Sequence, residues 1–141
     1  MQSARYHAAP VDGGDAISTW QSTDALPSDF LAEVVLQAEP VGVQQNGFLV
    51  LDYQTPTDFK FVAAFFATNH WAIGHRTPTS WVKDVSFNQT IQTSTDYHFA
   101  IDVQGGTTVS LSVDGAMLGD YTFTDQVSDG CLLYTSDAAD E

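Results

Sequence analysis

Alternation of apolar and polar residues over short stretches is the feature that most constrains the fold of this 141-residue chain. It is clearest in Phe30–Gln37 (FLAEVVLQ), Tyr97–Val103 (YHFAIDV) and Thr108–Val113 (TVSLSV). A period of two places the apolar side chains on one face, which predicts half-buried antiparallel strands. Gln104–Gly106 (QGG) and Asp114–Gly115 (DG) supply the positive φ angles of tight hairpins. The sequence therefore predicts an all-β protein, a sandwich of two antiparallel sheets.

The central segment, residues 46–77 (NGFLVLDYQTPTDFKFVAAFFATNHWAIGHRT), is predicted to form two consecutive hairpins. With Pro56 at the centre of the first turn, Asp52 lies opposite Lys60. The second turn is expected at Thr68–Asn69, which places Val62 opposite His75. Because successive side chains of a strand point to opposite faces, this register divides the segment into two faces.

One face of the central segment is predicted to be core, and the other to display polar and aromatic groups. The predicted core face carries Leu49, Leu51, Tyr53, Phe59, Phe61 and Phe65. The predicted display face carries Asp52, Gln54, Lys60, Trp71 and His75. Arg76 falls on the core side in this register, which indicates either a bulge near Gly74 or a different pairing there.

The charge balance excludes some partners. The chain has 18 acidic residues against four Lys and Arg, a formal net charge of −14. Such a surface repels phosphate groups, so no nucleic-acid partner is expected. No apolar run approaches the ~20 residues that span a bilayer, so no membrane insertion is expected. Three of the four cations, Lys60, Arg76 and Lys83, lie close together in the sequence, which favours a binding site there.

The C-terminal segment Cys131–Glu141 (CLLYTSDAADE) is unlike the rest of the chain, and it contains the only cysteine. It resembles, codon for codon, the translation of the transposase-end adapter used in DNA library preparation. We therefore predict one domain over residues 1–130 and a non-native tail over residues 131–141. The alternative is a genuine acidic tail.

The segment Asn46–Arg76 resembles the bacterial laminin-G-like branch of the concanavalin A-like lectin/glucanase superfamily. The resemblance extends upstream through LPSDFLAEVVLQ and downstream through TDYHFAIDV, TTVSLSVDG and YTF. It implies a jelly-roll sandwich with one concave sheet, in a secreted bacterial protein with neighbouring domains. It also implies a last strand after YTF. Because the tail begins there, we expect that strand to be missing and an aggregation-prone edge to be exposed.

A catalytic site is not expected. Glucan-cleaving members of the superfamily place carboxylates at alternating strand positions, which brings two of them within ~5–5.5 Å for retaining hydrolysis. This chain has no such run, since Glu33 and Glu39 are too far apart and Asp52 has no nearby carboxylate. No Gly-x-Ser-x-Gly motif occurs either. A hydrolase with unrecognised carboxylates stays open as the least favoured alternative.

Calcium is the one cofactor that the sequence suggests. Superfamily members often hold one ion in a loop, and Asp12 and Asp15 in VDGGD (Val11–Asp15) offer the oxygen ligands that Ca²⁺ prefers. His70 and His75 flank a Trp but lack a third ligand with metal spacing.

These observations predict a non-catalytic, lectin-like module that binds carbohydrate or a protein partner on the concave sheet. Trp71 is the expected stacking platform, and the cross-strand pair of Asp52 and Lys60 the polar grip. The candidate ligand-binding residues are Asp52, Gln54, Lys60, Trp71, His75, Arg76 and Trp81. The alternative is a structural spacer or adhesion module, in which the charged pair is an ordinary surface ion pair worth up to ~1 kcal/mol.

Overall fold

The structure, a computed structural model, describes residues 15–21, 27–37, 46–127 and 131–137, with the backbone alone for the first and last of these ranges. In chain order the strands are β1 (Asp15–Gln21), β2 (Phe30–Leu36), β3 (Asn46–Thr55), β4 (Asp58–Phe65), β5 (His70–Arg76), β6 (Trp81–Asn88), β7 (Tyr97–Gln104), β8 (Thr108–Val113), β9 (Ala116–Thr122) and β10 (Cys131–Asp137). No helix in these segments could cross a membrane.

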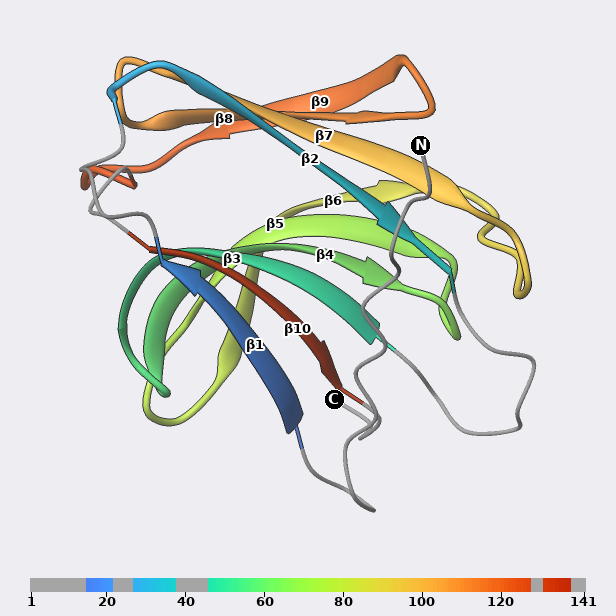
Figure 1. The fold of residues 1–141 in the computed structure, drawn as a ribbon, viewed down its shortest axis with the longest axis horizontal. Helices are drawn as coiled ribbons and strands as arrows, with labels where there is room; N and C mark the ends of the chain where they lie inside the picture. Colours follow the sequence, from blue (N-terminus) through green and yellow to red (C-terminus); the bar gives the residue numbers. More distant parts are fainter. Residues whose placement is uncertain (1–14, 22–26, 38–45, 128–130, 138–141) are drawn as a thin grey trace.

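The strands form two antiparallel sheets, one stacked on the other (Figure 1). The six-stranded sheet has the order β1-β10-β3-β4-β5-β6, and the four-stranded sheet the order β2-β7-β8-β9. The predicted all-β sandwich is therefore confirmed. Figure 1 also shows that the six-stranded sheet curves away from the four-stranded one, which makes its outer face concave.

The four-stranded sheet follows directly from the sequence periodicity. Along β7 the burial alternates residue by residue, with Phe99 and Ile101 buried and His98 and Asp102 exposed. The hairpin turns also have the predicted backbone, since Gly115 has a φ of 84° at the β8–β9 turn. One face of this sheet therefore packs inward and the other meets solvent.

A large apolar core fills the space between the sheets. Its fully buried members come from both sheets and include Leu36, Leu51, Val62, Trp71, Ile73, Phe99, Ile101, Val103, Val109 and Leu111. Burial of this many large side chains is the main driving force for the fold, at roughly 1.5–3 kcal/mol for each.

A second apolar cluster lies on the other side of the six-stranded sheet, away from this core. Its buried members are Phe48, Val50, Phe59, Phe61, Ala63, Phe65 and Ala72, with Tyr53 and Trp81 packed against them. All belong to β3, β4, β5 and β6. The middle of the six-stranded sheet is therefore apolar on both faces.

The register of the central hairpins differs from the prediction. Lys60 lies opposite Leu51 rather than Asp52, because β3 departs from regular pairing between Leu51 and Thr55. Asp52, in this irregular stretch, has a φ of 49°. The predicted core face was therefore wrong in β4, since its phenylalanines lie in the outer cluster and not with Leu49 and Leu51 between the sheets.

Strand β5 is also displaced from its predicted partners, and a bulge accompanies it. Lys60, not Val62, lies opposite His75. This shift of two residues still leaves Lys60 and His75 on one side of the sheet and Phe59 and Arg76 on the other, as in the predicted pairing. The pairing of β5 with β6 is irregular between Ile73 and Gly74. The bulge expected near Gly74 is therefore present, on the β6 side, and it leaves Asp84 as the extra residue.

The expectation of a missing last strand is wrong for this structure. Cys131–Asp137 forms β10, which pairs with β1 over the whole strand and with β3 from Leu133 to Asp137. These seven consecutive residues pair with the edge of β3 that would otherwise be exposed, and they join β1 to the sheet. The origin of this segment in a sequencing adapter stays a prediction.

Candidate functional site

Trp81 is the first residue of the edge strand β6, and its ring packs against the outer apolar cluster on the concave face. Its ring centroid lies 5.0 Å from that of Phe48, 5.5 Å from that of Phe59 and 5.5 Å from that of Phe61. Trp81 is half-buried, whereas the three rings beneath it are almost fully covered. It is thus a flat aromatic group held from below with part of its surface accessible, the arrangement that suits stacking against a ligand.

Two cations flank Trp81 on the same face. The guanidinium carbon of Arg76 lies 5.2 Å from the centre of the Trp81 ring, and the ammonium nitrogen of Lys83 lies 4.1 Å from the centre of the Phe65 ring. Arg76 also donates hydrogen bonds from Nη1 to the backbone carbonyls of Thr77 and Ser80. These contacts fix the guanidinium against the ring, since cation–π attraction acts at such distances.

The register explains why these side chains share a face. Arg76 pairs with Trp81 and Phe59, and Gly74 pairs with Lys83 and Phe61. A Cβ atom on Gly74 would meet the Val82 carbonyl oxygen at 2.0 Å and the Phe61 ring at 2.8 Å. Only glycine fits here, and its missing side chain leaves the space that the Phe61 ring occupies.

We call this surface the Trp81 face. It consists of Trp81, Arg76, Lys83, His70 and Tyr53 over the rings of Phe48, Phe59, Phe61 and Phe65. His70 stacks on Phe65 with ring centroids 4.7 Å apart, and Tyr53 stacks on Phe59 at 5.9 Å. The polar ends of its half-buried members can hydrogen-bond a ligand while their rings complete the apolar surface.

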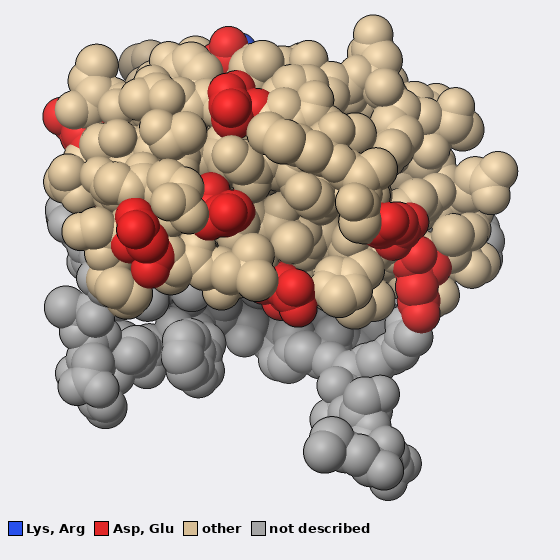
Figure 2. Space-filling view, turned by 90° about the horizontal axis from the view of Figure 1, so that it is seen from above, with Lys and Arg blue, Asp and Glu red and all other residues tan. Residues whose placement is uncertain are grey.

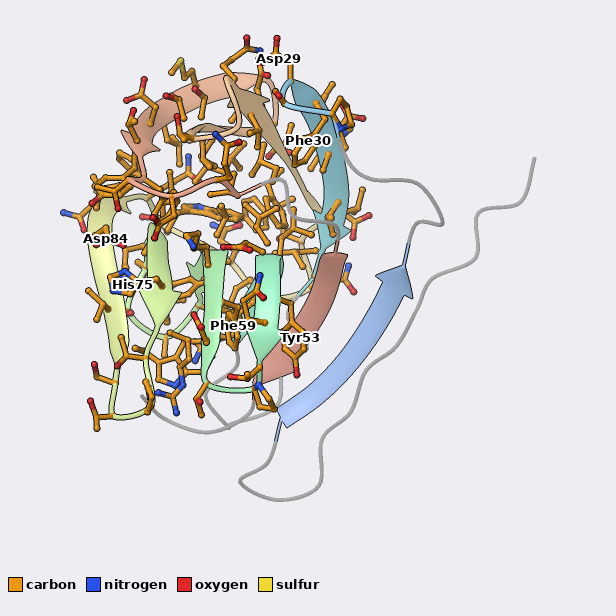
Figure 3. All side chains as sticks on the ribbon, turned by 90° about the vertical axis from the view of Figure 1, so that its left-hand side faces the viewer. Asp29, Phe30, Tyr53, Phe59, His75 and Asp84 are labelled. Atoms are coloured by element: carbon orange, nitrogen blue, oxygen red, sulfur yellow. The ribbon has the colours of Figure 1, made fainter. Side chains whose placement is uncertain are left out.

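The opposite side of the same strands carries a row of charged groups, which we call the polar row: Asp52, Lys60, His75 and Asp84. Lys60 Nζ lies 2.5 Å from Asp52 Oδ2, and His75 Nδ1 lies 2.7 Å from Asp84 Oδ2. Gln54 donates to the other oxygen of Asp52 at 2.6 Å. Figure 3 shows His75 and Asp84 side by side on β5 and β6. Each polar group in the row is satisfied by a partner within it.

The predicted site is therefore divided between two faces. The polar row and Gln54 lie on the side that faces the core, and Arg76 and Trp81 lie on the concave face. The predicted ion pair of Asp52 and Lys60 is present. It cannot grip the same small ligand as Trp81, because the sheet separates them.

Trp71 is not a stacking platform, and that prediction is wrong. Its side chain is fully buried between the sheets, with its ring centroid 5.5 Å from that of Phe99. Its indole nitrogen donates a 2.8 Å hydrogen bond to Gln89 Oε1. The prediction correctly placed Trp71 on the same side of the sheet as His75. At the position of Trp71, however, that side packs into the core.

The sequence prediction left Lys83 out of the site, although a signal for it exists. Lys83 lies two residues after Trp81, so a regular strand places both side chains on one face. Its partner across the ladder is Gly74, which carries no side chain to cover it.

Asp52 and Asp84, the two carboxylates of the polar row, do not form a glycosidase pair. Asp52 on β3 and Asp84 on β6 are separated by three strand spacings of ~4.8 Å, or roughly 14 Å. Retaining and inverting hydrolases need carboxyl groups about 5 to 9.5 Å apart. Each carboxylate is also engaged by its own basic partner.

The predicted calcium ligands fall outside what the structure describes: Asp12 entirely, and Asp15 in its side chain. Asp15 begins β1, where its backbone pairs with Asp137. Among the described residues, no group of three His, Cys, Asp or Glu side chains could hold a metal ion. Calcium binding therefore stays a prediction.

Comparison with known proteins identifies the fold. No family model matches the sequence, and no curated protein matches it significantly. Among solved structures, the carbohydrate-binding module CBM66 from Bacillus subtilis matches with a TM-score of 0.73 and 13% identity, over 92% of this chain and 81% of that one. A Caenorhabditis elegans galectin matches with a TM-score of 0.62 and 15% identity, over 94% and 91%. A toad ovary galectin in complex with thio-digalactose matches with a TM-score of 0.65 and 8% identity, over 86% and 91%. The chain thus has the concanavalin A-like lectin sandwich fold.

Proposed function

We propose that this protein is a non-catalytic carbohydrate-binding module and that saccharides bind on the Trp81 face. The observation that carries the proposal is the half-buried indole of Trp81, which packs against three phenyl rings on the concave face of the six-stranded sheet. A rigid aromatic plane provides apolar contact for the C–H face of a sugar ring and loses little conformational entropy on binding.

The fold neighbours support this proposal without fixing it. One is a carbohydrate-binding module and another is a galectin bound to thio-digalactose. At identities of 8 to 15% the likeness concerns the fold. The function therefore rests on the side chains, because lectin folds host unrelated sites.

The polar groups of the face suit saccharide hydroxyls. Arg76 has five N–H donors, of which Nη1 serves the Thr77 and Ser80 carbonyls, so donors remain for a ligand. The hydroxyl of Tyr53 and the ammonium of Lys83 add further hydrogen-bonding groups at the rim. A few directional groups around an apolar centre is the usual composition of a ligand site.

Affinity electrophoresis against immobilised neutral and acidic polysaccharides tests the proposal. We expect at least one polysaccharide to retard the wild-type protein and Trp81→Leu to weaken that retardation at least tenfold, since a central aromatic contact contributes ~2 kcal/mol. Leucine keeps the apolar cover over the phenylalanines, and circular dichroism confirms the fold of the variant. His75→Ala is the matched control on the opposite face and should bind normally. The proposal fails if no polysaccharide binds, or if His75→Ala and not Trp81→Leu abolishes binding.

A second candidate function is docking to a protein partner. Leu31 and Val35 are 62% and 53% exposed on β2, an edge of the four-stranded sheet. Exposed apolar side chains on an edge strand favour pairing with another chain. The double variant Leu31→Thr/Val35→Thr should reduce self-association or partner binding in sedimentation experiments if this function holds, and should leave saccharide binding unchanged.

A further inference from the structure

We infer that the ligand of the Trp81 face is an acidic saccharide whose carboxylate or sulfate group is held by Arg76 and Lys83. This inference rests on the proposed function and specifies its ligand class. Its basis is the distribution of charge across the six-stranded sheet, which is independent of the aromatic geometry.

The acidic residues of β3–β6 all lie on one side of the sheet, where Lys60 is paired with Asp52. These strands carry Asp52, Asp58 and Asp84 on the side that faces the core. Their outer side carries Arg76 and Lys83 and no Asp or Glu. The whole chain has 18 acidic residues and four Lys and Arg. It is therefore unusual that the outer side of these four strands carries cations and no acidic residue.

The four-stranded sheet shows the opposite character. Its strands contain Glu33, Asp102 and Asp120 and no Lys or Arg. Figure 2, which looks onto the molecule from that side, shows scattered carboxylates and almost no Lys or Arg. All three described cations thus belong to the six-stranded sheet, and two of them lie beside Trp81.

Within the part of the chain that the structure describes, no carboxylate neutralises the two cations of the Trp81 face. Lys60 is paired with Asp52, whereas neither Arg76 nor Lys83 forms an ion pair with a carboxylate of the described residues. Both rest on aromatic rings instead. Cations held this way keep their hydrogen-bond donors for a charge-assisted bond to an incoming anion.

The placement of the two cations matches a saccharide on Trp81. Lys83 follows Trp81 by two residues, so their Cα atoms are about 7 Å apart along β6. Arg76 lies across from Trp81 on β5. A saccharide in contact with Trp81 would therefore lie next to Arg76, and Lys83, over Phe65 on the same face, could bind an anionic substituent on it or on the next residue of the polymer.

The large negative charge of the whole chain does not prevent such binding. Charges separated by more than a Debye length, about 8 Å at physiological ionic strength, are largely screened. An anion seated on the Trp81 face interacts mainly with Arg76 and Lys83, since the carboxylates of the same strands lie beyond the sheet. The distant charge slows association more than it weakens the complex.

Isothermal titration with defined oligosaccharides tests the inference: oligogalacturonate for a carboxylate, a sulfated galactan fragment for a sulfate, and neutral galacto-oligosaccharide as reference. We expect one acidic ligand to bind at least tenfold more tightly than the neutral one, with a dissociation constant that rises with added salt. Lys83→Gln should weaken that acidic ligand roughly tenfold, as for the loss of one charge-assisted hydrogen bond. The carboxylate and the sulfate arms identify which anion is recognised.

A matched control separates local from global electrostatics. Gln92→Glu alters the net charge by the same amount as Lys83→Gln, at an exposed position outside the Trp81 face, and should change binding less than twofold. The inference is overturned if neutral and acidic ligands bind equally, or if both variants weaken binding alike. If neutral ligands bind and Trp81→Leu abolishes that binding, the carbohydrate function stands and only the acidic specificity fails. If nothing binds, both fail.

Discussion

Arg76 lies over Trp81, with its guanidinium carbon 5.2 Å from the ring centre, and its Nη1 hydrogen-bonds to the carbonyls of Thr77 and Ser80. The turn between β5 and β6 thus holds the cation that in turn covers part of the indole. This relationship links a local turn to the accessible surface of the proposed site, and it can be tested separately from the ligand.

Arg76→Ala should remove the guanidinium that covers part of the Trp81 indole. We expect a loss of about 1 kcal/mol in unfolding free energy, since it removes one cation–π contact and the hydrogen bonds to the turn. Chemical denaturation measures the loss, and acrylamide quenching of tryptophan fluorescence should rise. Arg76→Lys keeps the charge but not the planar group, so it should restore stability only in part. Unchanged quenching in Arg76→Ala would contradict the contact.

Gly74→Ala should be one of the most destabilising single changes in the chain. The new Cβ would lie 2.0 Å from the Val82 carbonyl oxygen and 2.8 Å from the Phe61 ring, so backbone must move. We expect a loss of at least ~3 kcal/mol by denaturant unfolding. Gly47→Ala is the matched control, because its Cβ would meet only the flexible methyl groups of Leu36 at 3.2 Å. Similar losses in the two variants would contradict the close approach at Gly74.

Trp71→Phe should affect stability and not ligand binding. The substitution leaves Gln89 without its donor and removes part of a fully buried ring, which together cost ~2 kcal/mol or more. Saccharide affinity should stay within twofold of wild type. A selective loss of affinity with normal stability would restore Trp71 as the platform that the sequence predicted.

Asp52 and Lys60 should be strongly coupled for a pair near the surface. Their side chains are only 7% and 13% exposed, and the carboxylate also accepts from Gln54. A double-mutant cycle with Asp52→Asn and Lys60→Met should give a coupling energy of about 1–2 kcal/mol. Asparagine tolerates the positive φ of Asp52, so the cycle reports the charge interaction and not backbone strain. A coupling below ~0.3 kcal/mol would reduce the pair to an ordinary surface contact.

Removal of β10 should disrupt the sandwich. The strand lies between β1 and β3, so a chain that stops at Gly130 loses two ladders of hydrogen bonds and exposes the edge of β3. We expect that variant to aggregate or to unfold at least 15 °C below wild type. A chain that stops at Asp137, where β10 ends, is the control and should behave normally. Normal melting of the shorter chain would show that the strand adds nothing.

The sequence predicts the four-stranded sheet better than the six-stranded one, for a physical reason. In β7 and β8 one face meets solvent, so the apolar residues of each strand reveal the buried face. In β3, β4 and β5 both faces are apolar, because a core lies on one side and the Phe cluster on the other. The alternation of apolar and polar residues then cannot show which side is the core. Trp71 and Trp81 are therefore assigned to the ligand-binding site from their residue type alone.

For a related reason, the sequence pattern did not predict the irregularity at Asp52. A bulge shifts the pairing by one residue and so exchanges the faces beyond it. Asp52 combines a positive φ with contacts to Lys60 and Gln54, and its contact with Lys60 on β4 forms only in the folded sheet. Of the candidate ligand-binding residues, only Arg76 and Trp81 lie on the Trp81 face, and this division of the candidates between two faces required the structure.

The most direct test of the proposed function is a two-dimensional NMR titration of the protein with the tightest-binding saccharide from the electrophoresis panel. The indole N–H signals provide matched probes, since Trp81 lies on the concave face and Trp71 is buried against Gln89. We expect the Trp81 indole and the backbone amides of Arg76 and Lys83 to shift in proportion to bound ligand, while the Trp71 indole stays in place. Shifts confined to Asp52, Gln54 and His75, with Trp81 unchanged, would place the ligand on the other side of the sheet and contradict the proposed site.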